Sequence, residues 1–211
     1  MLTRGSHMTQ VLSIHSSLFA EASVSRQLST HLHNVLKTHS DTIRFHDRNV
    51  VSDEIPHFSA QTITDIGEGK ADLADQLITE VQDADLLLID APMYNFAIPS
   101  QLKSWFDHIA RAGLTFRYTE NGPQGLLIGK KAIVLATRGG IHKDSITDTQ
   151  TSYLTTMLRF IGIDDVRFVY AEGLNMGNER RRDAIANAKA EIDMLAADLA
   201  HHQNTKEVAL P

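Results

Sequence analysis

The chain has 211 residues, a length that suits one globular domain and is short for two. Hydrophobic residues make up 42% and charged residues 22%, a composition that excludes a disordered or fibrous chain. With 20 basic and 26 acidic side chains the net charge is -6, which argues against binding to nucleic acid or to an anionic membrane. The cysteine count of 0 excludes disulfides, iron–sulfur clusters, thiolate zinc sites and a cysteine nucleophile, so redox chemistry would need a cofactor.

Residues 1–7 and residues 8–211 are expected to have different origins. Residues 1–7 are interpreted as the remnant of an expression tag, because Arg4-Gly5-Ser6-His7-Met8 resembles the product of a protease-cleaved tag. Residues 8–211 then form one domain. No secretory signal is visible after Met8, and no apolar run approaches the roughly 20 residues that span a bilayer, so a cytoplasmic location is expected.

Short apolar runs alternate with segments of helical period, which predicts βαβ units and a parallel sheet. Five strands are expected, at residues 11–14, 42–45, 86–89, 132–136 and 166–170. Helices are expected over residues 28–37, 71–81, 100–110, 149–161 and 179–201. Residues 48–69 are expected to be a long loop with room for a short helix. Asn121-Gly122-Pro123, between residues 116–118 and 126–128, predicts a hairpin or an irregular ribbon.

This element order indicates an α/β fold: a flavodoxin-like, doubly wound, five-stranded parallel sheet with helices on both faces. In such sheets ligands bind beyond the carboxyl ends of the strands, near the point where the strand order reverses. The loops after the first, third and fourth expected strands are therefore the candidate site.

The first of these loops, residues 16–25, carries four serines ahead of a helix. Hydroxyls and unpaired N–H groups at a helix N-terminus bind a phosphate without a lysine. The alternative is that Ser23 or Ser25 serves only as the helix N-cap. The loop lacks the GxGxxG and GxxxxGK[ST] patterns, which argues against a dinucleotide Rossmann site and a P-loop NTPase.

The other two loops offer groups that suit a flat ligand. Met93, Tyr94 and Phe96 provide an apolar wall for a planar heterocycle, and Asn95 provides hydrogen bonds to its polar edge. The alternative is that these side chains are core residues around a turn. In residues 137–142 the paired glycines permit close approach of the backbone to a ligand, or else form a tight turn that needs positive φ. Together the three loops favour a flat, phosphate-bearing ligand.

Three segments carry a family resemblance: Ala91-Pro92-Met93-Tyr94-Asn95-Phe96, residues 110–123, and Arg138-Gly139-Gly140-Ile141-His142. They closely resemble the bacterial FMN-dependent NADH:azoreductases, and the resemblance runs from about Met8 to the last helix. It implies a homodimer with FMN at the dimer interface. It also implies the FMN contacts, which are Ser17, Ser23, Val24 and Ser25 at the phosphate, Met93, Tyr94, Asn95 and Phe96 along the isoalloxazine, and Thr137, Arg138, Gly139 and Gly140 at its far edge. The family often has serine in place of Thr137 and a polar residue in place of Val24, which could contribute only its backbone amide.

The resemblance further implies a ping-pong oxidoreductase. NADH or NADPH delivers a hydride to flavin N5 and leaves, and a quinone or an azo compound then takes two electrons from the same face. This chemistry needs no catalytic side chain, and no metal site is expected. Phe96, Tyr118 and Phe160 are expected to form an aromatic wall over the open flavin face, with burial in the core as the alternative.

Two other functions remain open at this point. A flavodoxin-type electron carrier would bind FMN without turning over a pyridine nucleotide, but the mild charge and the serine-rich loop argue against it. A non-catalytic binding module on the same fold is the second. His142 and the pair His201-His202 are expected to be solvent-exposed, and Arg180-Arg181-Arg182 a charged helix face. The sequence leaves the physiological acceptor and the choice between NADH and NADPH open.

Overall fold

The computed structural model describes residues 9–208, and the side chains of residues 9–199. The expected tag at residues 1–7 and the side chains of His201-His202 lie outside the described residues. Five strands form one parallel sheet in the order β2-β1-β3-β6-β7. Their bounds are Arg44–Asn49 for β2, Gln10–His15 for β1, Leu86–Pro92 for β3, Lys131–Thr137 for β6 and Asp165–Ala171 for β7. The flavodoxin-like, five-stranded parallel sheet predicted from the sequence is confirmed.

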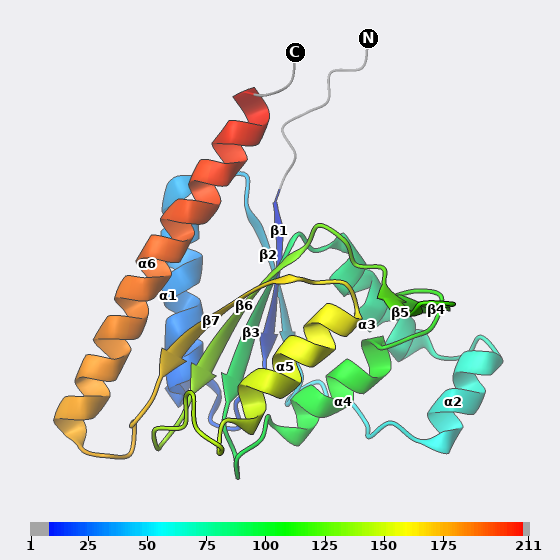
Figure 1. Cartoon of the computed structure of the whole chain (residues 1–211), viewed down its shortest axis with the longest axis horizontal. Helices are drawn as coiled ribbons and strands as arrows, with labels where there is room; N and C mark the ends of the chain where they lie inside the picture. Colours follow the sequence, from blue (N-terminus) through cyan, green and yellow to red (C-terminus); the bar gives the residue numbers. More distant parts are fainter. Residues whose placement is uncertain (1–8, 209–211) are drawn as a thin grey trace.

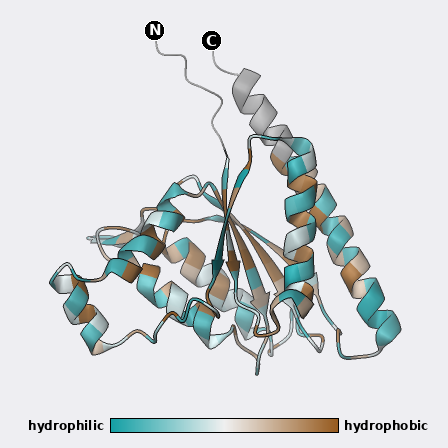
Figure 2. Cartoon of the chain, turned by 180° about the vertical axis from the view of Figure 1, so that it is seen from behind, coloured by the Kyte–Doolittle hydropathy of each residue, from teal (hydrophilic) through white to brown (hydrophobic). Residues whose placement is uncertain are grey.

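Helices cover both faces of this sheet (Figure 1). One face carries α1 (Val24–His39) and α6 (Asn178–Val208), and the other carries α3 (Asp72–Asp83), α4 (Ser100–Ile109) and α5 (Thr149–Phe160). Figure 2 shows apolar strands between helices whose outer faces are hydrophilic, and each face of the sheet has its own buried apolar cluster. Among the described residues no helix is both long and apolar enough to cross a membrane.

Pairing with β1 decided the extent of the edge strand β2. The sequence predicts a strand at residues 42–45, but β2 runs over Arg44–Asn49 and is mostly exposed. Its six residues pair in parallel register with all of β1, from Gln10 with Arg44 to His15 with Asn49. An edge strand needs hydrogen bonds on one side only and can be polar, so its own hydrophobicity did not mark its end.

The two excursions from the sheet contain the short helix and the hairpin for which the sequence carries signals. α2 (Ala60–Gly67) lies in the expected long loop and begins with a capping box between Ser59 and Thr62. The hairpin predicted around Asn121-Gly122-Pro123 is confirmed: β4 (Phe116–Thr119) pairs with β5 (Gly122–Gly125), which lies before the flanking segment 126–128. A Cβ on Gly125 would lie 2.1 Å from the Gly162 nitrogen, so this strand needs glycine to pass another backbone closely.

Candidate functional site

The loops after β1, β3 and β6 meet at the carboxyl edge of the sheet, where the strand order reverses between β1 and β3. The hydroxyls of Ser17 and Tyr94 lie 3.3 Å apart and connect the first loop to the second. The Met93 N–H donates to the Thr137 carbonyl at 2.9 Å and connects the second loop to the third. The fold therefore brings together the three loops that the sequence singled out.

The first loop contains the short helix η1 (Ala20–Ala22) and leads into α1. Ser23 is the N-cap of α1, because its hydroxyl accepts the Arg26 N–H at 3.1 Å. The hydroxyls of Ser23 and Ser25 lie 3.3 Å apart, and Ser25 is already inside the helix. At a helix start the first N–H groups, here those of Val24 and Ser25, have no partner within the helix. A serine that caps a helix through its oxygen keeps its own O–H for donation. The N-cap role of Ser23 is therefore compatible with phosphate binding by this loop.

The second loop is a strained turn. The Tyr94 N–H donates to the Ala97 carbonyl at 2.9 Å, and the Ala97 N–H donates back at 3.1 Å. The two central residues, Asn95 and Phe96, have positive φ angles of 50° and 66°. These angles are typical of a type I′ turn, in which glycine is the usual choice and a bulky residue is strained. Backbone strain of this kind is concentrated at binding and catalytic sites. The turn holds the Phe96 side chain 54% exposed at the edge of the sheet.

Tyr94 has a second role in this turn. Its hydroxyl accepts the Leu18 N–H at 3.2 Å as well as facing Ser17, and its ring lies edge-on to Phe19 at 6.4 Å. Tyr94 therefore fixes the serine-rich loop against the strained turn.

Gly139 and Gly140 of the third loop lie close to neighbouring residues. The Gly139 and Gly140 carbonyls accept from Asn175 N–H at 3.0 Å and Gly173 N–H at 2.8 Å. Within residues 9–208 the structure gives no hydrogen bond to the N–H of either glycine, so these two donors are available to a ligand. A Cβ would lie 2.6 Å from the side chain of Asn175 at Gly139 and 2.7 Å from that of His142 at Gly140. Neither glycine has positive φ, so the alternative of a turn that needs such a φ is wrong.

Arg138 anchors this loop from below. Its guanidinium is fully buried and donates to Asp148 at 2.7 Å, Glu172 at 3.0 Å and Gln150 at 3.2 Å. Its backbone N–H donates to the Ala171 carbonyl at 2.9 Å. Burial would raise the pKa of Asp148, but the hydrogen bonds from Arg138 and Thr151 outweigh it and hold that pKa below its usual value. The contacts expected between Arg138 and a ligand would therefore have to come from its glycine neighbours.

His142 differs from the expectation of a solvent-exposed side chain. It is half-buried, its Nδ1 lies 2.8 Å from the Thr147 hydroxyl, and its N–H donates to Glu172 at 2.9 Å. Its ring stands edge-on to Phe96 with centroids 5.7 Å apart. The only signal in the sequence was its place two residues after Gly140.

The expected aromatic wall is not assembled within one chain. Tyr118 and Phe160 both pack on Phe116, with ring centroids 5.4 and 4.4 Å apart. Phe96 lies at the opposite end of α5, where its carbonyl accepts from the Thr149 hydroxyl. At 1.5 Å rise per residue, α5 separates Phe160 from this end by about 16 Å. Tyr118 is 76% exposed, so it is not a core residue of the chain.

A charged cluster that sequence reasoning missed lies beneath the first loop. His15 Nδ1 is 2.8 Å from Asp90, His15 Nε2 is 3.1 Å from Asp47, and Arg26 also contacts Nε2. A small cavity opens between this cluster and the loop, lined by His15, Ser17, Ala20, Glu21, Ser23, Arg26, Asn49 and Asp90. The available signal was that His15 is the last residue of β1 and that Asp90 is the one charged residue in the otherwise apolar strand β3.

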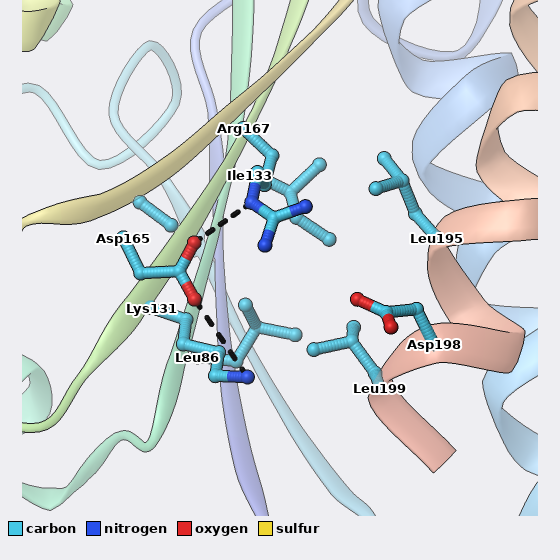
Figure 3. A pocket seen from close by; sticks show the side chains of 9 residues that line it. Leu86, Lys131, Ile133, Asp165, Arg167, Leu195, Asp198 and Leu199 are labelled. Carbon is cyan, nitrogen blue, oxygen red and sulfur yellow. Dashed lines mark hydrogen bonds and ion pairs between the residues drawn. The ribbon is translucent and has the colours of Figure 1, made fainter. Parts of the chain in front are cut away.

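A second pocket lies at the amino edge of the sheet (Figure 3). There Asp165 pairs with Arg167 at 2.8 Å and with Lys131 at 3.7 Å, and Leu195 and Asp198 of α6 face them. In this pocket Arg167 and Lys131 are paired with Asp165, and the pocket lies away from the loops after β1, β3 and β6. Within the described part of the chain no group of three or more His, Cys, Asp or Glu side chains is placed to hold a metal ion.

Comparisons with known proteins agree with this geometry. The model of the flavodoxin-like fold family matches residues 9–195. The chain is 47% identical over 198 residues to a protein of Saccharophagus degradans named FMN-dependent NADH:quinone oxidoreductase, covering 90% of this chain and 94% of that one. It is 44% identical over 200 residues to the protein of the same name from Escherichia coli strain UTI89, covering 90% of this chain and 100% of that one.

Solved structures give the same result. An azoreductase from Bacillus anthracis strain Sterne superposes with a TM-score of 0.82 at 27% identity, covering 90% of this chain and 99% of that one. An FMN-dependent NADH-azoreductase from Bacillus anthracis strain Ames Ancestor, in complex with FMN, also has a TM-score of 0.82 at 27% identity, with 92% and 100% covered. The chain therefore belongs to the flavodoxin-like family of FMN-dependent NADH:quinone oxidoreductases and azoreductases.

Proposed function

We propose that this protein is an FMN-dependent oxidoreductase that uses NADH to reduce quinones and azo compounds. The observation that carries the proposal is the meeting of three loops at one sheet edge. They provide a serine-rich helix start, a strained aromatic turn and a pair of glycines with free N–H groups. The chain that builds this edge is 47% identical to a protein named FMN-dependent NADH:quinone oxidoreductase.

The residues present fit FMN. The hydroxyls of Ser17, Ser23 and Ser25 and the N–H groups at the start of α1 would hold the phosphate, with Val24 contributing its backbone only. The strained turn, residues 93–96, would line the isoalloxazine. Thr137 and the N–H groups of Gly139 and Gly140 would donate to its polar edge. The side chains of Asn175 and His142 lie where a Cβ on Gly139 and Gly140 would come, which favours glycine at both positions.

Flavin supplies the redox chemistry and the protein supplies the environment. When bound, FMN accepts a hydride from NADH or NADPH and returns two electrons to the acceptor in a separate half-reaction. A quinone then needs one such ping-pong cycle and an azo bond needs two. The N–H groups of Gly139 and Gly140 would stabilise negative charge that develops on a ligand at this edge, because fixed donors need no reorganisation. No side chain of the chain acts as a nucleophile or general base in this scheme, and no metal takes part.

A homodimer is part of the proposal. Tyr118 and Phe160 lie about 16 Å along α5 from Phe96, a separation that follows from the rise of the helix. In a dimer whose FMN sites lie at the interface, Tyr118 and Phe160 of one subunit would close the site of the other, opposite Phe96. The high exposure of the Tyr118 ring supports this arrangement. A cytoplasmic location completes the proposal, since NADH is a donor of the cell interior.

The visible spectrum of FMN-reconstituted protein tests the function. The spectrum is recorded anaerobically before and after NADH, and again after a simple quinone. We expect bleaching by NADH and recovery with the quinone. A bound flavin that neither NADH nor NADPH bleaches would indicate an electron carrier instead, and the absence of bound flavin would refute both functions.

A further inference from the structure

The cluster beneath the serine-rich loop joins three strands and a helix. His15 ends β1, Asp47 lies on β2, Asp90 lies on β3 and Arg26 lies in the first turn of α1. His15 and Asp90 are buried, and Asp90 Oδ1 has no hydrogen-bond partner among the described residues. An unsatisfied buried carboxylate oxygen is costly, which makes a purely structural role a poor explanation for it.

The cluster faces the same cavity as the proposed phosphate site. Ser17 and Ser23 line this cavity together with His15, Arg26 and Asp90. A phosphate held by these serines would therefore lie at the cavity that His15 also lines. Charge on His15 acts on such an anion through a partly buried path, where water screens little.

We propose that His15, held between Asp90 and Asp47, is a positioning residue whose positive charge tightens binding of the FMN phosphate. The inference rests on the proposed function. It adds a residue that acts on the phosphate through the cavity, whereas the serines act by direct contact.

The charged groups around His15 determine whether protonation of His15 strengthens or weakens phosphate binding. Asp90 and Asp47 accept from it, Arg26 contacts it from α1, Glu21 of η1 pairs with Arg26 at 3.1 Å, and His33 of α1 lies near enough to be coupled to it. Burial lowers the pKa of His33 to about 4, so His33 stays neutral above pH 5. When His15 is protonated, it and Arg26 offset two of the three carboxylates Asp47, Asp90 and Glu21. When it is neutral, Arg26 alone offsets them, and the cluster becomes more negative toward the phosphate.

The pKa of His15 falls in the pH range of a flavin-binding experiment. Burial and the charge of Arg26 would lower the pKa of His15, but its hydrogen bonds to Asp47 and Asp90 and the charge of Asp90 outweigh them and raise it to about 8. The charged form favours phosphate, so binding is tight below this pKa and weakens as the pH rises through it. By linkage, bound phosphate raises the same pKa further. The phosphate itself is a dianion above about pH 7, so its own titration does not contribute.

The test compares FMN with riboflavin, which lacks the phosphate. Dissociation constants of the flavin-free protein are measured by fluorescence titration at pH 7 and pH 9. We expect FMN binding to weaken about fivefold across this range if phosphate raises the His15 pKa by one unit, and riboflavin binding to stay constant. His15→Gln should bind FMN more weakly at pH 7 and show no change between the two pH values.

Two further variants keep the test decisive. Asp47→Asn removes a half-exposed carboxylate and should move the midpoint of the FMN effect to lower pH, which a loss of folding would not do. His31→Gln removes a histidine of α1 that pairs with Asp193 instead of facing the cavity, and should keep the wild-type profile. An equal pH effect for FMN and riboflavin, or an unchanged effect in His15→Gln, would overturn the inference. Failure of both flavins to bind at every pH would overturn the proposed function and this inference with it.

Discussion

Replacing Arg138 by methionine should be among the most destabilising single changes in the chain. The guanidinium is fully buried and bonded to Asp148 at 2.7 Å and Glu172 at 3.0 Å, which are themselves largely buried. Arg138→Met leaves both carboxylates without their cation. Breaking a buried ion pair by removing one partner costs about 3–5 kcal/mol, a large share of a total stability of about 5–15 kcal/mol.

Urea unfolding followed by far-UV circular dichroism measures this loss, with an unchanged m value if the unfolded state is unaffected. The matched control is Arg167→Met. Arg167 pairs with Asp165 at 2.8 Å, but its side chain is 52% exposed, so its loss should cost about 0–1 kcal/mol. A cost of Arg138→Met no larger than that of the control would refute the reasoning.

The pH dependence of the same variant is a second check. The bonds to Arg138 and Thr151 hold the pKa of Asp148 below its usual value. A depressed pKa gives stability that is present above the unfolded value of about 3.9 and is lost as the pH falls through the folded value. The difference between wild type and Arg138→Met should therefore be largest near pH 7 and shrink below about pH 4. A constant difference across this range would contradict the pairing.

Three further predictions concern backbone and aromatic positions. Gly125→Ala places a Cβ 2.1 Å from the Gly162 nitrogen and should cost at least about 2 kcal/mol in urea unfolding, whereas Gly67→Ala meets nothing within 4 Å and should cost less than about 0.5 kcal/mol. Tyr118→Ala should leave stability within about 0.5 kcal/mol of wild type but raise the quinone KM about five- to tenfold in steady-state assays, and an unchanged KM would remove Tyr118 from the site. Phe96→Gly relieves the residue at φ 66° and should leave stability unchanged or raised by about 1 kcal/mol while weakening acceptor binding; a loss of stability would show that the turn is not strained.

Much of the fold followed from local patterns. The run Leu86-Leu87-Leu88-Ile89 is buried throughout, as expected for a central strand covered on both faces. The alternation of such runs with helical segments implied parallel strands, and parallel strands place their following loops at one edge. The sequence therefore predicts that the serine-rich loop, the turn at Asn95 and the paired glycines lie together.

Other features depended on residues far apart in the chain. β2 extends to Asn49 because all of β1 pairs with it, and no property of residues 46–49 alone signals a strand. The contact between His15 and Asp90 spans 75 positions, and the bond between Arg138 and Glu172 spans 34. Each of these polar residues reads as an isolated charge in the sequence.

Hydrophobic periodicity and turn chemistry are local properties of the chain, so they predicted most of the strands and helices and the loops that border the site. They contained no sign that Arg138 holds a loop, that His15 lies between two carboxylates, or that Tyr118 and Phe160 lie far from Phe96 in one chain. Burial, pairing of charges and distance across an element depend on how segments pack against one another, and these relations exist only once the chain has folded.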